Sequence, residues 1–168
     1  QLEGGKLIVS DVIFLEAGRA IAVLKGEIIL RQCDIQTEYG IHIDSGSAAV
    51  YDSTFAADCD INCREEGTIT FFEGTEFPGG LSVSGVYLEN LLSEGMAYWR
   101  GNTMILPGEG ATNIWSDVTV KAACTHENST IVYIPKDRDS HLVAHSCCGI
   151  GHTEPHSLGD EGICTICG

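Results

Sequence analysis

Basic residues are scarce in this chain: 9 Lys and Arg stand against 24 Asp and Glu, which gives a formal net charge of -15. Contact with nucleic acid or with an anionic membrane surface requires a basic face. The composition therefore removes both from the expected partners. It suits a surface-displayed protein or one that binds cations.

Long apolar runs and prolines are scarce as well. No stretch approaches the roughly 20 apolar residues of a membrane-spanning helix, so no membrane insertion is expected in this segment. The 20 glycines and 4 prolines favour tight turns between short strands over disorder. Because the chain begins at Gln1 and not at Met, we expect the natural protein to extend upstream.

Common catalytic motifs are missing too. The chain has no Gly-x-Ser-x-Gly elbow, no Gly-x4-Gly-Lys phosphate loop and no His-Glu-x-x-His pair. His42 stands alone outside the C-terminal region, and its place between Ile41 and Ile43 predicts a solvent-exposed side chain. The sequence therefore favours a non-enzymatic role.

What the first half does contain is a repeat of 20–21 residues. Apolar-x-apolar units recur at this spacing, and each unit has the period of a short strand. Two further apolar units follow within every repeat, so each repeat predicts three strands separated by glycine-rich or polar corners. The last of the three units also aligns between repeats, with a slip of one residue in the fourth copy. Its residue pairs are Val12/Phe14, Cys33/Ile35, Ser53/Phe55 and Gly74/Phe77.

Stacked repeats place equivalent residues above one another at the strand spacing of about 4.8 Å. The predicted inward-facing columns are Ile21–Ile41–Ile61–Leu81, Val23–Ile43–Cys63–Val83, Leu7–Ile28–Ala48–Ile69 and Val9–Leu30–Val50–Phe71. The pattern predicts an all-β parallel β-helix. An antiparallel sandwich is the alternative, but it does not explain the constant period.

Residues 1–85 resemble right-handed β-helix repeats, which implies about 20–21 residues per coil. Solenoid ends require caps, so we expect more coils before Gln1 and a C-terminal cap or linker at residues 86–118. Residues 119–168 are expected to form a separate metal-binding module of the zinc-ribbon kind.

Cysteines and histidines in this last region lie at the spacing of metal ligands. His145-x-x-Cys148-Gly149 repeats the spacing of Cys164-x-x-Cys167-Gly168, a zinc-knuckle arrangement. The first predicted tetrahedral site is His145, Cys148, Cys164 and Cys167, and the second is Cys124, His126, His141 and His156. Histidine among the ligands favours Zn²⁺ over iron. Four protein ligands at each site would leave no open position for catalysis.

Other interpretations of the cysteines stay open at this point. Cys147 could replace its neighbour His145 as a ligand, and eight cysteines allow full disulfide pairing. Cys33 and Cys63 fall on inward positions and are expected to be buried thiols. Cys59 and Cys63 could pair in an oxidising setting.

The C-terminal pattern resembles a small Cys/His module that recurs, often in tandem, in large secreted and surface proteins of anaerobic Gram-positive bacteria. The matching residues are Cys124, His126, His141, His145, Cys148, Glu154-Pro155-His156-Ser157-Leu158, Gly162, Cys164 and Cys167. His145 stands where that module usually has cysteine. The resemblance implies a stalk or accessory module at an extracellular or cell-surface location.

An acidic column along the repeat raises a second hypothesis. Asp52 and Glu73 occupy equivalent places beside the aromatic pair Tyr51 and Phe72, a combination that could contact a carbohydrate. The expected function is a rigid rod with a zinc-stabilised end module for adhesion or assembly, with a surface protein, a glycan or another copy of the chain as partner. The alternative is a carbohydrate-binding or polysaccharide-degrading β-helix domain.

Overall fold

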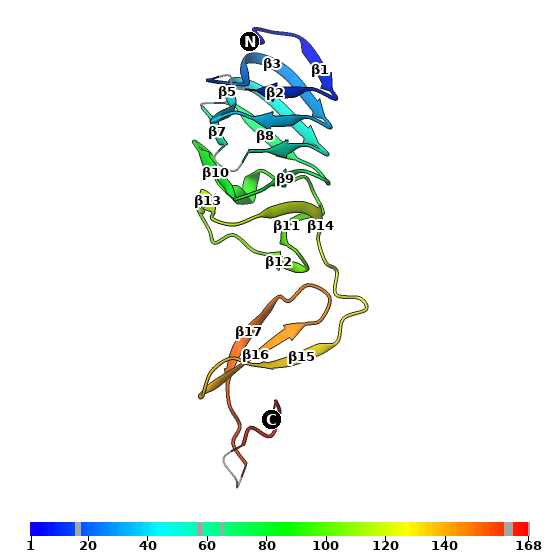
Figure 1. The fold of residues 1–168 in the computed structure, drawn as a ribbon, viewed down its shortest axis with the longest axis vertical. Helices are drawn as coiled ribbons and strands as arrows, with labels where there is room; N and C mark the ends of the chain where they lie inside the picture. Colours follow the sequence, from blue (N-terminus) through cyan, green and yellow to red (C-terminus); the bar gives the residue numbers. More distant parts are fainter. Residues whose placement is uncertain (16–17, 57–58, 65, 160–162, 168) are drawn as a thin grey trace. The chain divides into compact units, whose positions relative to one another are not determined.

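A computed structural model of the 168-residue chain describes residues 1–15, 18–56, 59–64, 66–159 and 163–167 (Figure 1). It divides into two compact units, residues 1–101 with 105–123 and residues 102–104 with 124–168. Gly162 and Gly168 of the expected knuckle pattern lie outside the described residues. In the described residues no helix is long and apolar enough to cross a membrane.

The first unit is a β-solenoid of stacked coils, each with three strand-bearing faces (Figure 1). Face 1 contains the first halves of β3 (Ile21–Arg31) and β5 (Tyr39–Tyr51), then β7 (Asp60–Cys63) and β10 (Leu81–Ser84). Face 2 contains β1 (Lys6–Ser10), the second halves of β3 and β5, and β8 (Thr68–Phe71). Face 3 contains β2 (Ile13–Leu15), β4 (Asp34–Gln36), β6 (Thr54–Phe55) and β9 (Glu76–Phe77). All these strands pair in parallel, so the predicted fold class is confirmed.

The predicted columns on face 2 are confirmed residue by residue, since Leu7, Ile28, Ala48 and Ile69 are successive partners. On face 1 the prediction fails in its last row. Val83 pairs with Ile61, and not with Cys63 as the constant spacing of twenty predicted. The fourth coil has one extra residue between Cys63 and Ile69 and another before Glu76, so the register moves by two residues.

The corners between faces 2 and 3 need a left-handed backbone. Asp11, Gln32 and Asp52 have φ of 59, 52 and 45°, and Gly74 follows at 80°. Short polar side chains and glycine tolerate this conformation better than other residues. This requirement accounts for the polar column that the sequence shows at these positions.

The interior of the solenoid is apolar and contains an aromatic cluster. Phe55 stacks on Phe77 with ring centroids 5.0 Å apart, and Phe71 meets both rings edge-on. These three side chains are at most 1% exposed. Their packing joins faces 2 and 3 of the third and fourth coils.

The C-terminal end of the solenoid is closed by strands that reverse direction. β13 (Asn113–Ile114) pairs antiparallel with β10, and β14 (Val118–Ala122) pairs antiparallel with β9 and with β11 (Met96–Arg100). The 3-10 turn Leu88–Asn90 follows β10, and the buried Tyr98 lies in β11. The Tyr98 hydroxyl donates to the Leu88 carbonyl at 3.1 Å. β12 (Thr103–Ile105) follows β11. The sequence put the end of the cap at residue 118, whereas the first unit extends to Ala123.

The second unit contains a three-stranded antiparallel sheet of β15 (Ile131–Pro135), β16 (Ser140–His145) and β17 (Gly151–Pro155). Among its described residues the buried aliphatic side chains are Val143 and Ala144. Ile131, Tyr133 and Ile134 are exposed. Apolar burial alone is too small to stabilise a unit of this size.

All eight cysteines are free thiols, so the Cys59–Cys63 disulfide considered from the sequence is not formed. Cys33, Cys59 and Cys63 are buried in the solenoid, as expected for Cys33 and Cys63.

Replacing Phe55 with Ala should lower the free energy of unfolding of the solenoid by about 3–5 kcal/mol, because it leaves a cavity in the aromatic cluster. Ile13→Ala, on the same face but 60% exposed, should cost well under 1 kcal/mol, as surface changes do. Urea unfolding of both variants measures the difference. Equal losses would contradict the assignment of Phe55 to the core.

Stability should also fall at alkaline pH. Burial raises the pKa of Cys59 to about 12 and that of Cys63 to about 11. Above the ordinary thiol pKa of about 9, the unfolded chain releases protons that the folded chain retains, so the free energy of unfolding falls between about pH 9 and 11–12. Cys63→Ala should flatten this fall in urea titrations across that range. An unchanged slope would assign the alkaline loss to other groups.

Candidate metal centres

Two groups of four Cys and His side chains lie in the second unit, at opposite ends of its sheet. Their ligand atoms lie within 4.8 Å of one another in each group. The near cluster is the one whose first ligand comes earlier in the sequence, and it consists of Cys124, His126, Cys147 and Cys148. It joins the segment before β15 to the turn after β16. The far cluster, defined as His141, His156, Cys164 and Cys167, lies where β16 begins and β17 has ended.

The antiparallel pairing of the sheet explains this arrangement. Ile131 pairs with His145, and Pro135 pairs with His141. The start of β15 therefore meets the end of β16, which brings Cys124 close to the Cys147–Cys148 turn. The pairing of Ser140 with Pro155 likewise brings His156 next to His141.

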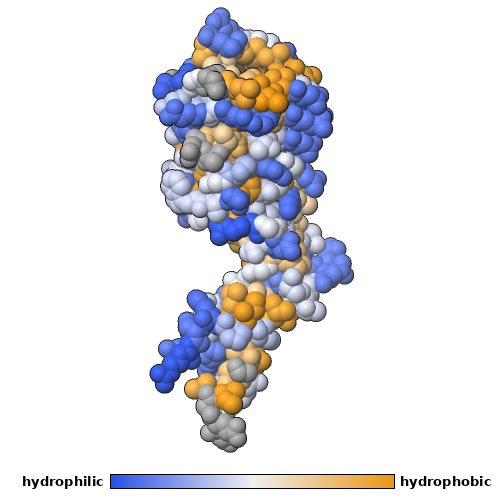
Figure 2. All heavy atoms as spheres, viewed as in Figure 1, coloured by the Kyte–Doolittle hydropathy of each residue, from blue (hydrophilic) through white to orange (hydrophobic). Residues whose placement is uncertain are grey.

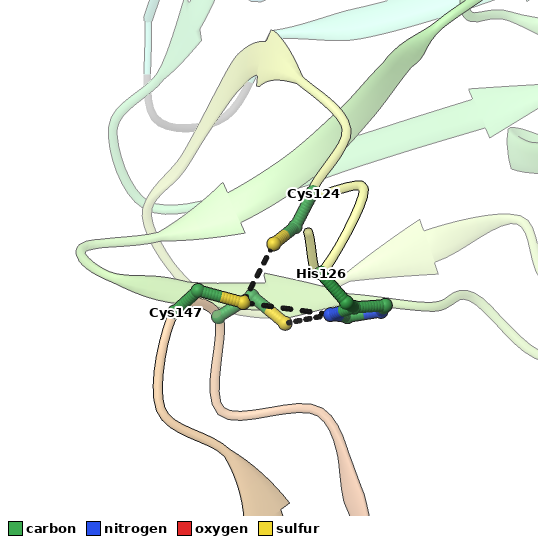
Figure 3. A group of neighbouring side chains, drawn as sticks. Cys124, His126 and Cys147 are labelled. Atoms are coloured by element: carbon green, nitrogen blue, oxygen red, sulfur yellow. Dashed lines mark hydrogen bonds between the residues drawn. The ribbon is translucent and has the colours of Figure 1, made fainter. Parts of the chain in front are cut away.

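In the near cluster the His126 Nδ1 atom faces two sulfurs (Figure 3). It lies 3.4 Å from Cys147 Sγ and 3.7 Å from Cys148 Sγ. Tetrahedral zinc with ordinary bond lengths separates a nitrogen from a sulfur by about 3.6 Å and two sulfurs by about 3.8 Å. The Cys124 and Cys147 sulfurs are 2.7 Å apart, so they would have to separate by about 1 Å around a metal.

The sulfurs of the near cluster share protons. The Cys124 and Cys147 sulfurs share a hydrogen bond, which lowers the pKa of Cys147 to about 6 and raises the pKa of Cys124 to about 11. The first of the two thiol protons is therefore released more readily than the proton of an ordinary cysteine. A cation that binds there would displace the remaining thiol protons, because thiolates are the ligand form of cysteine.

The far cluster is more enclosed. His141 is fully buried and its Nδ1 atom lies 3.8 Å from Cys164 Sγ, while the Nδ1 atom of His156 lies 3.6 Å from Cys167 Sγ. Both separations match a tetrahedral zinc site. Backbone N–H groups, first that of Cys167, lower the pKa of Cys164 to about 5.

Contacts with the turn at Asp137 orient His156. Its Nε2 atom lies 3.0 Å from the Asp137 carbonyl oxygen, which leaves Nδ1 with a lone pair directed at the sulfurs. The Asp137 carboxylate accepts hydrogen bonds from Ser140 Oγ and the Asp139 N–H, and these contacts lower its pKa. The turn that carries the carbonyl is therefore held by its own hydrogen bonds.

The donor sets fit zinc. The near cluster offers three sulfurs and one imidazole, and the far cluster offers two of each. Both sets are ordinary for structural zinc sites, and four protein ligands leave no position for a reactive water.

The structure groups the predicted ligands differently from the sequence. Seven of the eight residues proposed as ligands lie in the two clusters, but His141 belongs with Cys164 and Cys167, and Cys148 belongs with Cys124 and His126. His141 and His145 are four residues apart on one strand, which separates them by about 13 Å. The structure therefore does not bring His145 to Cys164 and Cys167, or His141 to Cys124 and His126, as the sequence grouping expected.

His145 is the predicted ligand that lies outside both clusters. Its ring stacks on that of His126 at 4.0 Å, and its buried Nδ1 atom has no hydrogen-bond partner among the described residues. Cys147 takes its place in the near cluster. This is the alternative left open by the sequence, in which Cys147 replaces His145 as a ligand. The turn at residues 146–148 after β16 is the feature that favours Cys147.

The residues proposed for carbohydrate contact lie in the first unit, the solenoid. The Tyr51 and Phe72 rings stack on each other at 4.1 Å, and the Arg31 guanidinium lies 4.7 Å from the Tyr51 centroid. Both faces of Tyr51 are therefore covered by the protein's own groups. Asp52 and Glu73 are exposed at the adjacent corner.

The fold and the two clusters define a class: a β-solenoid followed by a small Cys/His module whose clusters could hold metal ions. Comparisons with protein-family models, curated protein sequences and solved structures find no match for this chain.

The two groupings make opposite predictions for two neighbouring residues. Cys147→Ser should reduce bound zinc from about two ions to about one per chain, because it removes a sulfur from the near cluster. His145→Ala should leave zinc content unchanged. Elemental analysis of protein purified without chelator measures both. Loss of zinc in His145→Ala with retention in Cys147→Ser would restore the grouping proposed from the sequence.

Proposed function

We propose that this chain is a structural part of an extracellular or cell-surface protein, in which the solenoid is a rigid rod and zinc stabilises the end module. The observation that carries the proposal is the pair of closed four-residue Cys/His clusters in a unit with little apolar core. Structural zinc can supply the free energy of folding that such a unit lacks.

The solenoid supports the rod role by its construction. Each coil is hydrogen-bonded to the next through parallel strands on three faces, so the coils form one stiff unit with long side faces. Adhesion or assembly uses such faces, and the partner would be a surface protein, a glycan or another copy of the chain. The surface location rests on the resemblance of the Cys/His pattern to modules of secreted proteins.

Zinc removal should unfold the module and leave the solenoid intact. Structural zinc contributes about 10–16 kcal/mol in small zinc-dependent domains at neutral pH, far more than burial of Val143 and Ala144 can supply. We expect a chelator to abolish the hydrogen-exchange protection of β15, β16 and β17 while the protection of β3 and β5 is retained. Residue-resolved hydrogen exchange measures both units in one sample.

The double variant Cys124→Ser/Cys164→Ser, which removes one sulfur from each cluster, is the matched control. It should show the same loss of protection without a chelator. Addition of zinc after chelation should restore protection in the unaltered chain only. Persistent protection of the module in metal-free protein would overturn the proposed role of zinc.

A further inference from the structure

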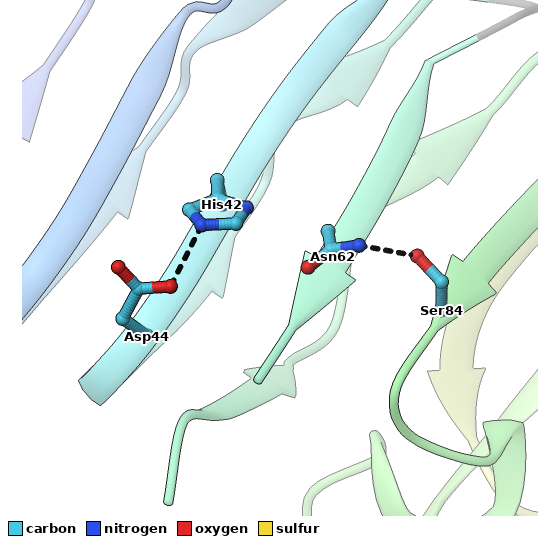
Figure 4. Close-up of polar contacts among 4 residues, drawn as sticks. All are labelled: His42, Asp44, Asn62 and Ser84. Atoms are coloured by element: carbon cyan, nitrogen blue, oxygen red, sulfur yellow. Dashed lines mark hydrogen bonds and ion pairs between the residues drawn. The ribbon is translucent and has the colours of Figure 1, made fainter. Parts of the chain in front are cut away.

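The outer side of face 1 carries a row of polar side chains, one of which is buried. His42, predicted as an exposed residue, is only 7% exposed, and its Nε2 atom lies 2.8 Å from Asp44 Oδ1 (Figure 4). In the next coil Asn62 Nδ2 donates to Ser84 Oγ at 2.7 Å, while Asn62 Oδ1 is buried with no partner in the described residues. Neighbouring side chains form the walls of a hollow beside this row.

That first hollow, of about 110 Å³, lies over β5 and β7. It is lined by Arg19, Tyr39, Ile41, His42, Asp60, Asn62 and Arg64. Within the described ranges no carboxylate forms an ion pair with Arg19 or Arg64. Two of the chain's 9 basic residues thus present their guanidinium groups at one small hollow, without an ion-pair partner among the described residues.

A second hollow, of about 240 Å³, lies next along the same face and shares Asp60 with the first. Its outer edge is formed by Trp115, whose side chain is 80% exposed. Asp60 and Ser82 line it together with the backbone of Gly79 and Gly80. The two volumes together reach the lower end of the range of about 300–1,000 Å³ that small-molecule sites occupy.

The local fold fixes Trp115 at this edge. Leu81 pairs with Ile114 in the antiparallel β10–β13 ladder, so Trp115 lies beside Gly80 with its side chain outward. Gly80 has φ of +121°, and a Cβ there would lie 2.2 Å from the Ile114 carbonyl oxygen. The close approach of the two segments therefore requires glycine, and it holds the indole next to the hollow.

A surface tryptophan beside hydrogen-bonding side chains has the chemistry of a sugar site. The indole face can pack on the apolar face of a pyranose ring, Asp60 can accept from sugar hydroxyls, and the guanidinium groups can donate to them. The net charge of -15 opposes a polyanionic chain. We infer that the hollows on face 1 bind a neutral oligosaccharide, with one sugar packed on Trp115 and the next held by Asp60, Arg19 and Arg64.

This surface differs from the one suggested by the sequence. Trp115 forms no ring stack with another aromatic residue in the described part of the chain, whereas both faces of Tyr51 are covered. A free aromatic face is what a sugar needs.

The test is binding of the zinc-loaded full chain to an array of neutral oligosaccharides, namely glucan, mannan, xylan and galactan hexasaccharides, with hexagalacturonate as the anionic probe. The tightest neutral probe is then titrated by calorimetry. Trp115→Ala should weaken binding at least tenfold, and Asp60→Asn should weaken it severalfold. Tyr51→Ala is the matched aromatic control and should bind as the unaltered chain does.

Thermal unfolding checks that the variants fold. Because Trp115 is exposed, its replacement is expected to leave the fold intact. For a second variant of the same position, Trp115→Phe should retain part of the affinity because it keeps an aromatic face. No neutral probe bound, binding confined to hexagalacturonate, or loss of binding in Tyr51→Ala but not in Trp115→Ala would each overturn the inference.

Discussion

The hydrogen bonding of each coil to the next is the constraint on which the solenoid depends. A parallel ladder on three faces requires that every coil return to the same height, so extra residues are tolerated only at corners. The fourth coil contains two insertions of one residue, each at a corner. Because each extra residue is absorbed at a corner, the strand that follows keeps its inward side chains, as Ile69 and Phe71 do after the first insertion. Leu81 and Val83 therefore remain buried although their register has moved.

Closure of the stack follows from the same constraint. The last parallel strands would leave unpaired backbone groups, and β13 and β14 satisfy them by running antiparallel to β10 and β9. The first coil shows what an uncovered layer looks like: Leu7 is 43% exposed although its inward partner in the next coil, Ile28, is 3% exposed. Figure 2 shows apolar surface over this region. Inward position alone does not bury a side chain, because burial needs a neighbouring coil on each side.

The sequence predicted those features that depend on local period and missed those that depend on accumulated length or on which strand ends meet. The columns of face 2 were predictable because Leu7, Ile28 and Ala48 keep a constant spacing. The pairing of Val83 was not predictable in the same way, because it depends on the sum of two one-residue insertions at separate corners. The types of metal ligand were predictable from residue identity, but their grouping depends on the hairpin that carries β15 and β16. Burial of His42 depends on side chains from the neighbouring coils, which alternation within one strand does not show.

The same logic separates surfaces that only repeat from surfaces that can recognise a ligand. On face 2 the outward row continues from coil to coil, so the Tyr51 ring lies between the Phe72 ring and the Arg31 guanidinium. On face 1 the row is interrupted where the chain turns back at Gly80, and the next aromatic residue, Trp115, comes from the antiparallel cap and has no stacking partner in the described residues. A regular solenoid uses its own side chains to complete its surface. The point at which parallel stacking ends is therefore where an aromatic face with no stacking partner in the described residues can lie beside a carboxylate that lines two hollows.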